Sequence, residues 1–370
     1  MSTDNLSEPH DLSELHGELR AVARDLLAKA EVGTPIDWQL VAGSGWLGLE
    51  ACEDFDGADA TFAEVAVVLR ETGRAVSTGP YPAVATLSLG LLELLAPGPR
   101  RDQLLRDTVS GDAVPIVVVE GESNLDELDQ PRFHITGNEA GWQLNGVADL
   151  VLDVPRADRL LIPALDTGVP GGAIVVVAVE PGTAGLTIVD QPVLDLTRSF
   201  GRVTAADVVV PVDSVWRFES DGADVLRHLH DRAALGVACD SLGLSEAAMA
   251  ATVEYVGVRE QFDRKIGSFQ AVKHACADML VQVTVAQKLV DAAVRALATD
   301  QPGAAVAVAM AKSFTGGMAV DVAGSAMQLH GGMGYTWESG IHVYLKRAIL
   351  NRSLFGSPAQ HREALAARLR

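Results

Sequence analysis

The stretch from Glu254 to Met279, EYVGVREQFDRKIGSFQAVKHACADM, constrains the fold of this chain more than any other part of its sequence. It predicts an apolar, alanine-rich helix that ends near Phe262, followed by a short loop that contains Arg264 and Lys265. Ser268 is a good N-cap residue, so we expect a second helix to begin there. Because a helix N-terminus beside cationic side chains attracts anions, the stretch predicts a site for a phosphate-bearing ligand.

Composition limits the partners that the chain can bind. The 370 residues are 48% hydrophobic, enough for a large core, and they carry a formal net charge of -20. An acidic surface repels nucleic acid and anionic membranes, so we expect no nucleic-acid partner. We find no apolar run of the roughly 18–20 residues that a membrane span needs, and we therefore expect no span.

The three cysteines, Cys52, Cys239 and Cys276, are far apart in the sequence, and no C-x-x-C pattern occurs. This usage is typical of a chain with free thiols in a reducing compartment. The N-terminal segment is polar and acidic, unlike a signal peptide or a transit peptide. We therefore expect a cytoplasmic protein.

The hydrophobic pattern changes twice along the chain and divides it into three predicted domains. Residues 1–113 have apolar positions at helical spacing and predict an N-terminal helical domain. Residues 114–217 contain short runs rich in Val and Ile between Gly, Pro and Asn, which favour an antiparallel β-barrel or sandwich. Residues 218–370 return to long helical patterns on short loops, which favour a C-terminal four-helix bundle.

A second block, QLHGGMGYTWESGIHVYLKRA, runs from Gln328 to Ala348. Together with R-x-Q-F-x-x-x-I-G-x-F-Q-x-x-K-H-x-x-A-D-M in the first stretch, it resembles the two C-terminal signatures of acyl-CoA dehydrogenases, in their order and spacing. The segments Trp142–Gly146 and Asp195–Val203 are similar to the middle β-domain of that family. The resemblance implies an α+β multidomain fold in which a β-domain lies between two helical domains.

The resemblance also implies FAD as the cofactor. It places Arg259 at the FAD pyrophosphate, which a guanidinium can bind bidentately. Gln270 follows eleven positions later, as the family pattern requires, and Phe262 is placed to pack against the adenine. Taken alone, Arg259 has a simpler interpretation as a solvated cation at a helix end.

The second block adds further cofactor-binding residues by resemblance: Gln328, Leu329, His330, Gly331 and Gly332. Glycine lets a backbone approach a phosphate closely, although Gly-Gly after a helix is by default only a C-cap. In acyl-CoA dehydrogenases this segment completes the FAD site of a neighbouring subunit. The resemblance therefore implies a homo-oligomer or an assembly with a paralogous subunit.

The sequence departs from the family where the flavin ring would lie. Members of the family carry a Thr-Glu-Pro segment after the first strand of the β-domain, whereas this chain continues as Val117–Val119 and then Glu120–Glu122. Leu150–Leu152 stand in place of a Trp-Ile-Thr-like segment. The usual side-chain contacts to a flavin ring are therefore not expected, although backbone groups remain available.

The catalytic base departs from the family as well. Most members use a Glu after the second block, and Phe355, which cannot accept a proton, occupies that position here. Other members place the Glu early in the C-terminal domain, near the position of Ala233. Asp240 lies two helical turns further on, in the apolar sequence LGVACDSLGL, where burial should raise the pKa of its carboxyl and suit it to general-base catalysis. The alternative is a structural Asp240 bonded to a neighbouring polar group.

Two functions follow from the resemblance. The first is an FAD-dependent enzyme in which a carboxylate removes the α-proton of an acyl-CoA thioester, a hydride passes from the β-carbon to flavin N5, and electrons continue to an electron-transfer flavoprotein. The second is a non-catalytic or flavin-sharing subunit of a heteromeric acyl-CoA dehydrogenase, for example for a sterol side chain or another bulky acyl-CoA. We expect no metal site, because His330 and His342 have no partners at ligand spacing.

Overall fold

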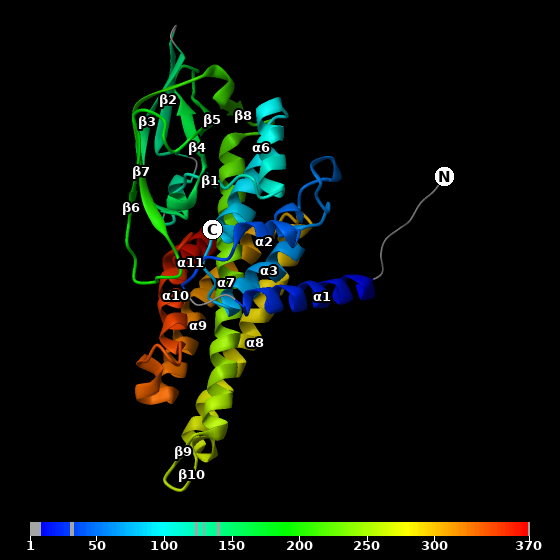
Figure 1. Ribbon diagram of the computed structural model, residues 1–370, viewed down its shortest axis with the longest axis vertical. Helices are drawn as coiled ribbons and strands as arrows, with labels where there is room; N and C mark the ends of the chain where they lie inside the picture. Colours follow the sequence, from blue (N-terminus) through cyan, green and yellow to red (C-terminus); the bar gives the residue numbers. More distant parts are fainter. Residues whose placement is uncertain (1–8, 30–32, 123–124, 129, 139–140, 369–370) are drawn as a thin grey trace, which may run out of the picture.

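The computed structural model describes residues 9–368 except 30–32, 123–124, 129 and 139–140. The described part has the three predicted regions: short helices, then a β-sheet, then long helices (Figure 1). The sheet lies beside the upper part of the long helices, which continue well below it in this view. The last strand of the sheet ends at Arg217, and the first long helix begins at Gly222.

The N-terminal region consists of short helices around an apolar core. Their bounds are α1 (Pro9–Leu27), α2 (Trp38–Gly43), α3 (Phe62–Arg74), α4 (Tyr81–Ala83), α5 (Leu89–Leu94) and α6 (Pro99–Val109). Helix α3 begins with a capping box, in which the carboxylate of Glu64 accepts the N–H of Thr61 at 2.8 Å. Its buried residues Val65, Val68 and Leu69 belong to the main core, and the helix packs against α1 and against the bundle.

The middle region is an eight-stranded sheet with the order β6-β7-β3-β2-β4-β5-β8, and β1 pairs with β4. The strands are β1 (Pro115–Val117), β2 (Phe133–Asn138), β3 (Gly141–Leu152), β4 (Arg159–Asp166), β5 (Ala173–Val179), β6 (Leu186–Asp190), β7 (Phe200–Val210) and β8 (Val215–Arg217). Most pairs are antiparallel, as predicted, but β4 runs parallel to both β1 and β2. Runs of Val and Ile indicate strands without fixing which neighbour each strand joins, so the sequence could not reveal these two pairs.

The C-terminal region is the predicted bundle of long helices. Its members are α7 (Gly222–Val258), α8 (Gln270–Ala298), α9 (Ala304–His330), α10 (Ile341–Ser353) and α11 (Pro358–Ala367). A small hairpin of β9 (Glu260–Gln261) and β10 (Arg264–Lys265) joins α7 to α8. Ser268 is not the N-cap of α8, because its hydroxyl donates to the carbonyl of Lys265 at 2.7 Å and the helix begins after Phe269.

Two glycines let α3 and α7 touch backbone to backbone. A Cβ atom at Gly243 would lie 1.8 Å from the carbonyl oxygen of Arg70, and one at Gly73 would lie 2.0 Å from that of Asp240. No side chain fits at either position without separating the two helices. The contact therefore fixes the N-terminal region against α7, the 37-residue helix at the centre of the bundle.

Helix α9 corrects one prediction from the sequence. By length and composition alone, the helical segment Ala304–Tyr335 is apolar enough to cross a membrane. Half of its most apolar window is buried inside the protein, where α9 packs against α7, α8 and α10. A buried bundle helix reaches such a composition because it meets apolar neighbours on several sides.

Candidate functional site

The first predicted cofactor motif lies at the far end of the bundle, where β9 and β10 join α7 to α8 (Figure 1). Arg259 caps α7 through its backbone: its N–H donates to the carbonyl of Tyr255 at 2.9 Å, and its own carbonyl accepts the N–H of Ile266 at 2.8 Å. The residue is exposed, as is Gln270 at the start of α8. Phe262 is 86% exposed. All three predicted side chains are thus open to a ligand at one end of the molecule.

The second predicted motif, residues 328–332, ends α9 at the same end of the bundle. His330 is buried, and its ring stacks on Tyr255 of α7 with 4.4 Å between ring centroids. This contact holds the ends of α9 and α7 together. Gln328 is exposed and Leu329 half-buried. A Cβ atom at Gly331 or Gly332 would meet nothing within 4 Å, so the backbone there is open to a ligand.

This end of the bundle fits the pyrophosphate and adenine half of FAD. An exposed guanidinium, here that of Arg259, is the group best suited to bind phosphate oxygens in two places. The open backbone at Gly331 and Gly332 lets an anion approach closely. Phe262 offers an exposed aromatic face to a base. Two stretches about seventy positions apart in the sequence therefore lie at one end of the fold.

The position expected for the flavin ring is closed by backbone hydrogen bonds. The N–H of Phe355 donates to the carbonyl of Gly121 at 2.7 Å, and the N–H of Gly121 donates to the carbonyl of Leu150 at 3.0 Å. A Cβ atom at Gly121 would lie 3.0 Å from that Leu150 oxygen and 3.0 Å from Leu354. The three segments that the resemblance places around the ring are thus bonded to one another.

Buried cationic and aromatic side chains hold the loop of residues 353–357, the Phe355 loop. Lys312 is fully buried, and its ammonium donates to the carbonyls of Asn351 at 3.0 Å and Gly356 at 2.8 Å. Burial lowers the pKa of Lys312 to about 7. His361 Nε2 lies 2.9 Å from the carbonyl oxygen of Phe355, whose φ of 51° is left-handed. The loop is therefore fixed from two sides in a conformation that non-glycine residues rarely adopt.

Asp240 does not have the environment predicted for a general base. One carboxylate oxygen accepts hydrogen bonds from Arg198 at 2.9 Å and Arg347 at 3.0 Å. The other accepts the side-chain amide of Asn351 at 2.7 Å. Asp240 is 2% exposed and does not line the pocket beside Phe355. Two guanidinium groups pair with this carboxylate, in contrast to the unpaired carboxylate that the apolar sequence suggested.

Arg347 extends this cluster to all three regions of the chain. It also donates to Asp195 of the middle region at 2.8 Å and to the carbonyl of Ser77 in the N-terminal region at 2.8 Å. We call the cluster of Ser77, Asp195, Arg198, Asp240, Arg347 and Asn351 the three-region junction. Its two carboxylates balance its two guanidiniums, and all four charged side chains are buried. The geometry gives Asp240 a structural role.

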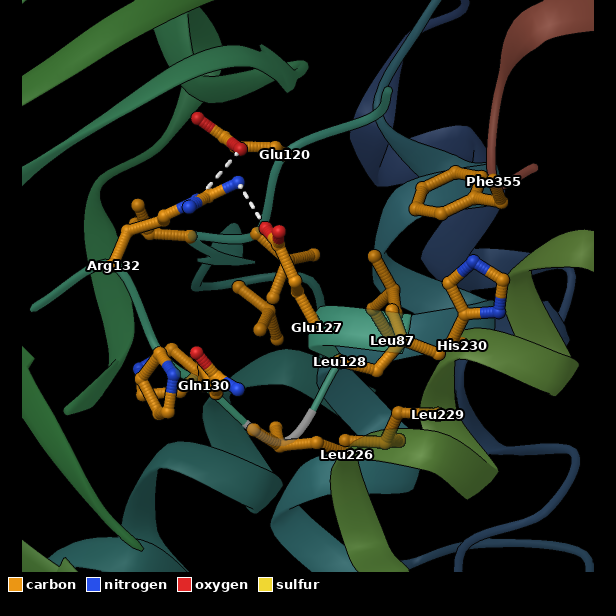
Figure 2. Close-up of a pocket in the computed structure, with 15 residues that line it drawn as sticks. Leu87, Glu120, Glu127, Leu128, Gln130, Arg132, Leu226, Leu229, His230 and Phe355 are labelled. Atoms are coloured by element: carbon orange, nitrogen blue, oxygen red, sulfur yellow. Dashed lines mark hydrogen bonds and ion pairs between the residues drawn. The ribbon is translucent and has the colours of Figure 1, made fainter. Parts of the chain in front are cut away.

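A pocket lies beside Phe355, between the sheet and the start of α7 (Figure 2). Its free volume is about 80 Å³. At its mouth, Arg132 pairs with Glu120 at 3.0 Å and with Glu127 at 3.2 Å. His230 lines the pocket close to Phe355, with 6.0 Å between the ring centroids. Sequence reasoning did not single out His230, because nothing in its helical pattern distinguishes it.

Among the described residues, no three His, Cys, Asp or Glu side chains gather as metal ligands.

The fold and these motifs define a class of flavin-dependent oxidoreductases, and comparison with known proteins identifies it. A family model described as "Acyl-CoA dehydrogenase, C-terminal domain" matches residues 220–370. The acyl-CoA dehydrogenase IpdE2 of Mycolicibacterium smegmatis is 30% identical over 358 residues, which cover 96% of this chain and 94% of that protein. The chain belongs to the acyl-CoA dehydrogenase family, whose members depend on FAD and act on the CH–CH group of acyl-CoA thioesters.

Solved structures confirm the predicted architecture. Butyryl-CoA dehydrogenase from Megasphaera elsdenii superposes with a TM-score of 0.86 at 22% identity over the full length of both chains. The ChsE4-ChsE5 complex from Mycobacterium tuberculosis contains a chain with a TM-score of 0.82 and 24% identity, covering 99% of each chain. A further match, at 25% identity and a TM-score of 0.82 over 97% of this chain and 98% of the other, is a variant of the Tcur3481-Tcur3483 steroid ACAD.

Proposed function

We propose that this chain is one subunit of a heteromeric acyl-CoA dehydrogenase, in which it completes the FAD site of a paralogous partner and the partner supplies the catalytic base. The observation that carries the proposal is a contrast between the two regions of the chain that the resemblance assigns to FAD binding. The end of the bundle with Arg259 and Gly331 is open and fits the pyrophosphate. The ring position between Gly121 and Phe355 is closed by a 2.7 Å backbone hydrogen bond.

The region around Phe355 is the reason that we assign the chemistry to the partner. Bound FAD would supply the acceptor for the hydride that leaves the β-carbon of the acyl group. In this chain Phe355 stands at the base position, and its side chain cannot accept a proton. Its backbone N–H could otherwise polarise a thioester carbonyl, but it already donates a hydrogen bond to the carbonyl of Gly121. What the chain contributes is binding: the guanidinium of Arg259 holds phosphate oxygens, and Phe262 covers the adenine.

The comparisons support a partner of the same family and a bulky substrate. ChsE4-ChsE5 and Tcur3481-Tcur3483 are each named as pairs, and the second is named as a steroid enzyme. We infer from these relatives that the assembly acts on a sterol-derived or similarly large acyl-CoA. An electron-transfer flavoprotein is the expected electron acceptor.

The alternative is a self-sufficient dehydrogenase that uses Asp240 as its base. It would require the Asp240 carboxylate to reach a substrate, whereas both oxygens are bonded to Arg198, Arg347 and Asn351. No feature of the pocket favours this alternative, because Asp240 is not among the residues that line it.

The two possibilities differ in how much FAD the chain retains. We would purify the chain alone and together with a paralogue from the same source, release bound flavin by heat, and measure FAD per chain from its absorbance. Little FAD on the folded chain alone, together with about one FAD per pair in the complex, is the expected result. One FAD per chain on the isolated protein, bleached by an acyl-CoA, would overturn the proposal.

A further inference from the structure

We propose that the Phe355 loop is a proton-dependent switch, which is closed while three buried basic side chains around it are neutral and opens when they take up protons. The three side chains are Lys312 of α9, His361 of α11 and His230 of α7. In the closed form the N–H of Phe355 donates to the carbonyl of Gly121. The inference goes beyond the proposed role in a heteromer, because it concerns this chain alone and requires neither a cofactor nor a partner.

The three basic groups surround the loop from different elements. The ammonium of Lys312 donates to carbonyls at the end of α10 and to the carbonyl of Gly356 at 2.8 Å. His361 Nε2 lies 2.9 Å from the carbonyl oxygen of Phe355. The His230 ring lies 6.0 Å from the Phe355 ring and 6.3 Å from the His361 ring, measured between centroids (Figure 2). A change of charge on any of the three therefore acts directly on this loop.

No carboxylate balances a positive charge at these positions. Among the described residues, none of the three basic groups forms an ion pair with Asp or Glu. The charged or titratable groups of the surrounding elements interact with one another instead: Asp231 with Arg368, Asp240 with Arg198 and Arg347, His228 and Glu50 with Arg232, and Glu120 and Glu127 with Arg132. The charged side chains Arg352, Arg362 and Glu363 of α10 and α11 are exposed. A proton taken up in the closed form is thus a buried charge without a counter-charge.

The direction of the switch follows from the pKa values. Burial lowers the pKa to about 7 for Lys312, about 4 for His361 and about 3 for His230. In water a lysine has a pKa of about 10.4 and a histidine of about 6.5. Opening exposes the groups to water, so the open form binds more protons than the closed form. Each group therefore weakens the closed form as the pH falls from its value in water towards its buried value.

The Phe355 loop is the segment that can respond to this change. Phe355 holds a left-handed φ of 51°, which is unfavourable for a residue with a side chain. Among the described residues, a single backbone hydrogen bond, from Phe355 to Gly121, joins the loop to the middle region. Opening relieves the strained dihedral angle and lets water reach the basic groups. A free volume of about 80 Å³ already lies beside Phe355 and His230.

Hydrogen exchange of the Phe355 N–H measures the opening. The full-length chain, with no cofactor added, is followed by NMR between about pH 8 and pH 5.5, and each rate is divided by the rate of an unstructured chain at the same pH. We expect the protection of this N–H to fall by about tenfold for each group that opening exposes to water, and by roughly a thousandfold if all three are exposed. The N–H of Val203, buried in β7, is the internal control and should not follow it.

Variants assign the protons to the three groups. His361→Gln keeps a side-chain donor near the Phe355 carbonyl but cannot be protonated, so the pH-dependent change should be about tenfold smaller. Lys312→Met should reduce the change by a similar factor and also lower the protection at pH 8, because the bonds to the carbonyls are lost. The matched control is His342→Gln, a buried histidine on α10 that does not contact the loop, and it should behave like the natural chain. If Lys312→Met does not fold, the natural chain and His361→Gln still decide the question.

Three results would overturn the proposal. The first is a protection of the Phe355 N–H that stays constant across the pH range. The second is a parallel fall in the protection of Val203, which would mean that acid unfolds the whole chain rather than opening one loop. The third is an unchanged pH dependence in His361→Gln and Lys312→Met, which would place the protons elsewhere. None of them depends on the FAD measurement, so a failure here is distinguishable from a failure of the heteromer proposal.

Discussion

Asp240 of α7 lies 3.0 Å from Arg347 of α10, and the same carboxylate oxygen lies 2.9 Å from Arg198 of the middle region. Both guanidiniums are buried. A carboxylate placed between two buried cations is needed for their charge balance, because each cation would otherwise be desolvated without a partner. A carboxylate bonded in this way supports the structure, and it is not free to accept a proton from a substrate.

Asp240→Asn should destabilise the chain strongly. Removing one partner of a buried ion pair costs about 3–5 kcal/mol of unfolding free energy. Urea or guanidinium denaturation measures the change. The control is Asp224→Asn on the same helix, where an exposed pair with Arg227 should contribute less than about 1 kcal/mol. An Asp240→Asn chain that keeps its full stability but no longer reduces flavin would restore Asp240 as a candidate base.

Asp231→Asn should change the pH dependence of stability. Burial raises the pKa of Asp231 to about 6, above the value of about 3.9 in an unfolded chain. The stability that this group contributes is fully present below about pH 4 and is lost as the pH rises through about 6. The variant should therefore match the natural chain near pH 4 and exceed it by the order of 1–3 kcal/mol near pH 8. A difference that does not vary with pH, in denaturation curves across this range, would contradict the assignment.

Arg259→Ala should release FAD from the assembled complex. Its guanidinium is the exposed group placed to hold the pyrophosphate, and hydrogen bonds to charged groups contribute about 1.5–3 kcal/mol, which corresponds to at least about a tenfold loss of affinity. The measurement is FAD per complex after gel filtration. Arg264→Ala is the matched control from the same hairpin, because Arg264 lies over the ring of Phe269, 3.9 Å from its centroid. Equal FAD retention in both variants would remove Arg259 from the site.

Phe355→Glu should not create a working active site in this chain. It restores a carboxylate at the usual position of the base, but the N–H of residue 355 remains bonded to Gly121. We expect no bleaching of flavin absorbance by an acyl-CoA, and a loss of about 3 kcal/mol or more in stability, because an aromatic core residue is replaced by a group that must be desolvated. Phe355→Leu should be much less destabilised. Flavin bleaching by Phe355→Glu would mean that the ring position opens more readily than the structure indicates.

The sequence predicted the local structure around part of the candidate cofactor site. Arg259 and Gln270 are held by a helix end, a hairpin and a helix start that all lie within one short stretch, so their motif appears directly in the sequence. The contact that joins this stretch to Gly331, through Tyr255 and His330, links distant parts of the sequence and was not predicted.

The hydrogen-bond partners of Asp240 could not be predicted from the sequence, for a physical reason. Its partners Arg198 and Arg347 lie 42 and 107 positions away, and no local periodicity reveals a pairing across such distances. The apolar neighbours of Asp240 correctly predicted that the residue is buried. They could not show that hydrogen bonds from Arg198, Arg347 and Asn351 offset the cost of burying its charge. The closed ring position escaped prediction for the same reason, because it depends on backbone bonds among Gly121, Leu150 and Phe355.

The three-region junction also bears on how this chain can be divided or recombined. The match to the C-terminal domain of the family begins at residue 220, yet the charges of Asp240 and Arg347 are balanced by Asp195 and Arg198 from the loop before β7. A fragment or chimera joined at that boundary would contain only part of the three-region junction, and some of its buried charges would lack their partners. A chimera that exchanges this C-terminal segment would therefore have to exchange the loop before β7 with it, because that loop carries Asp195 and Arg198.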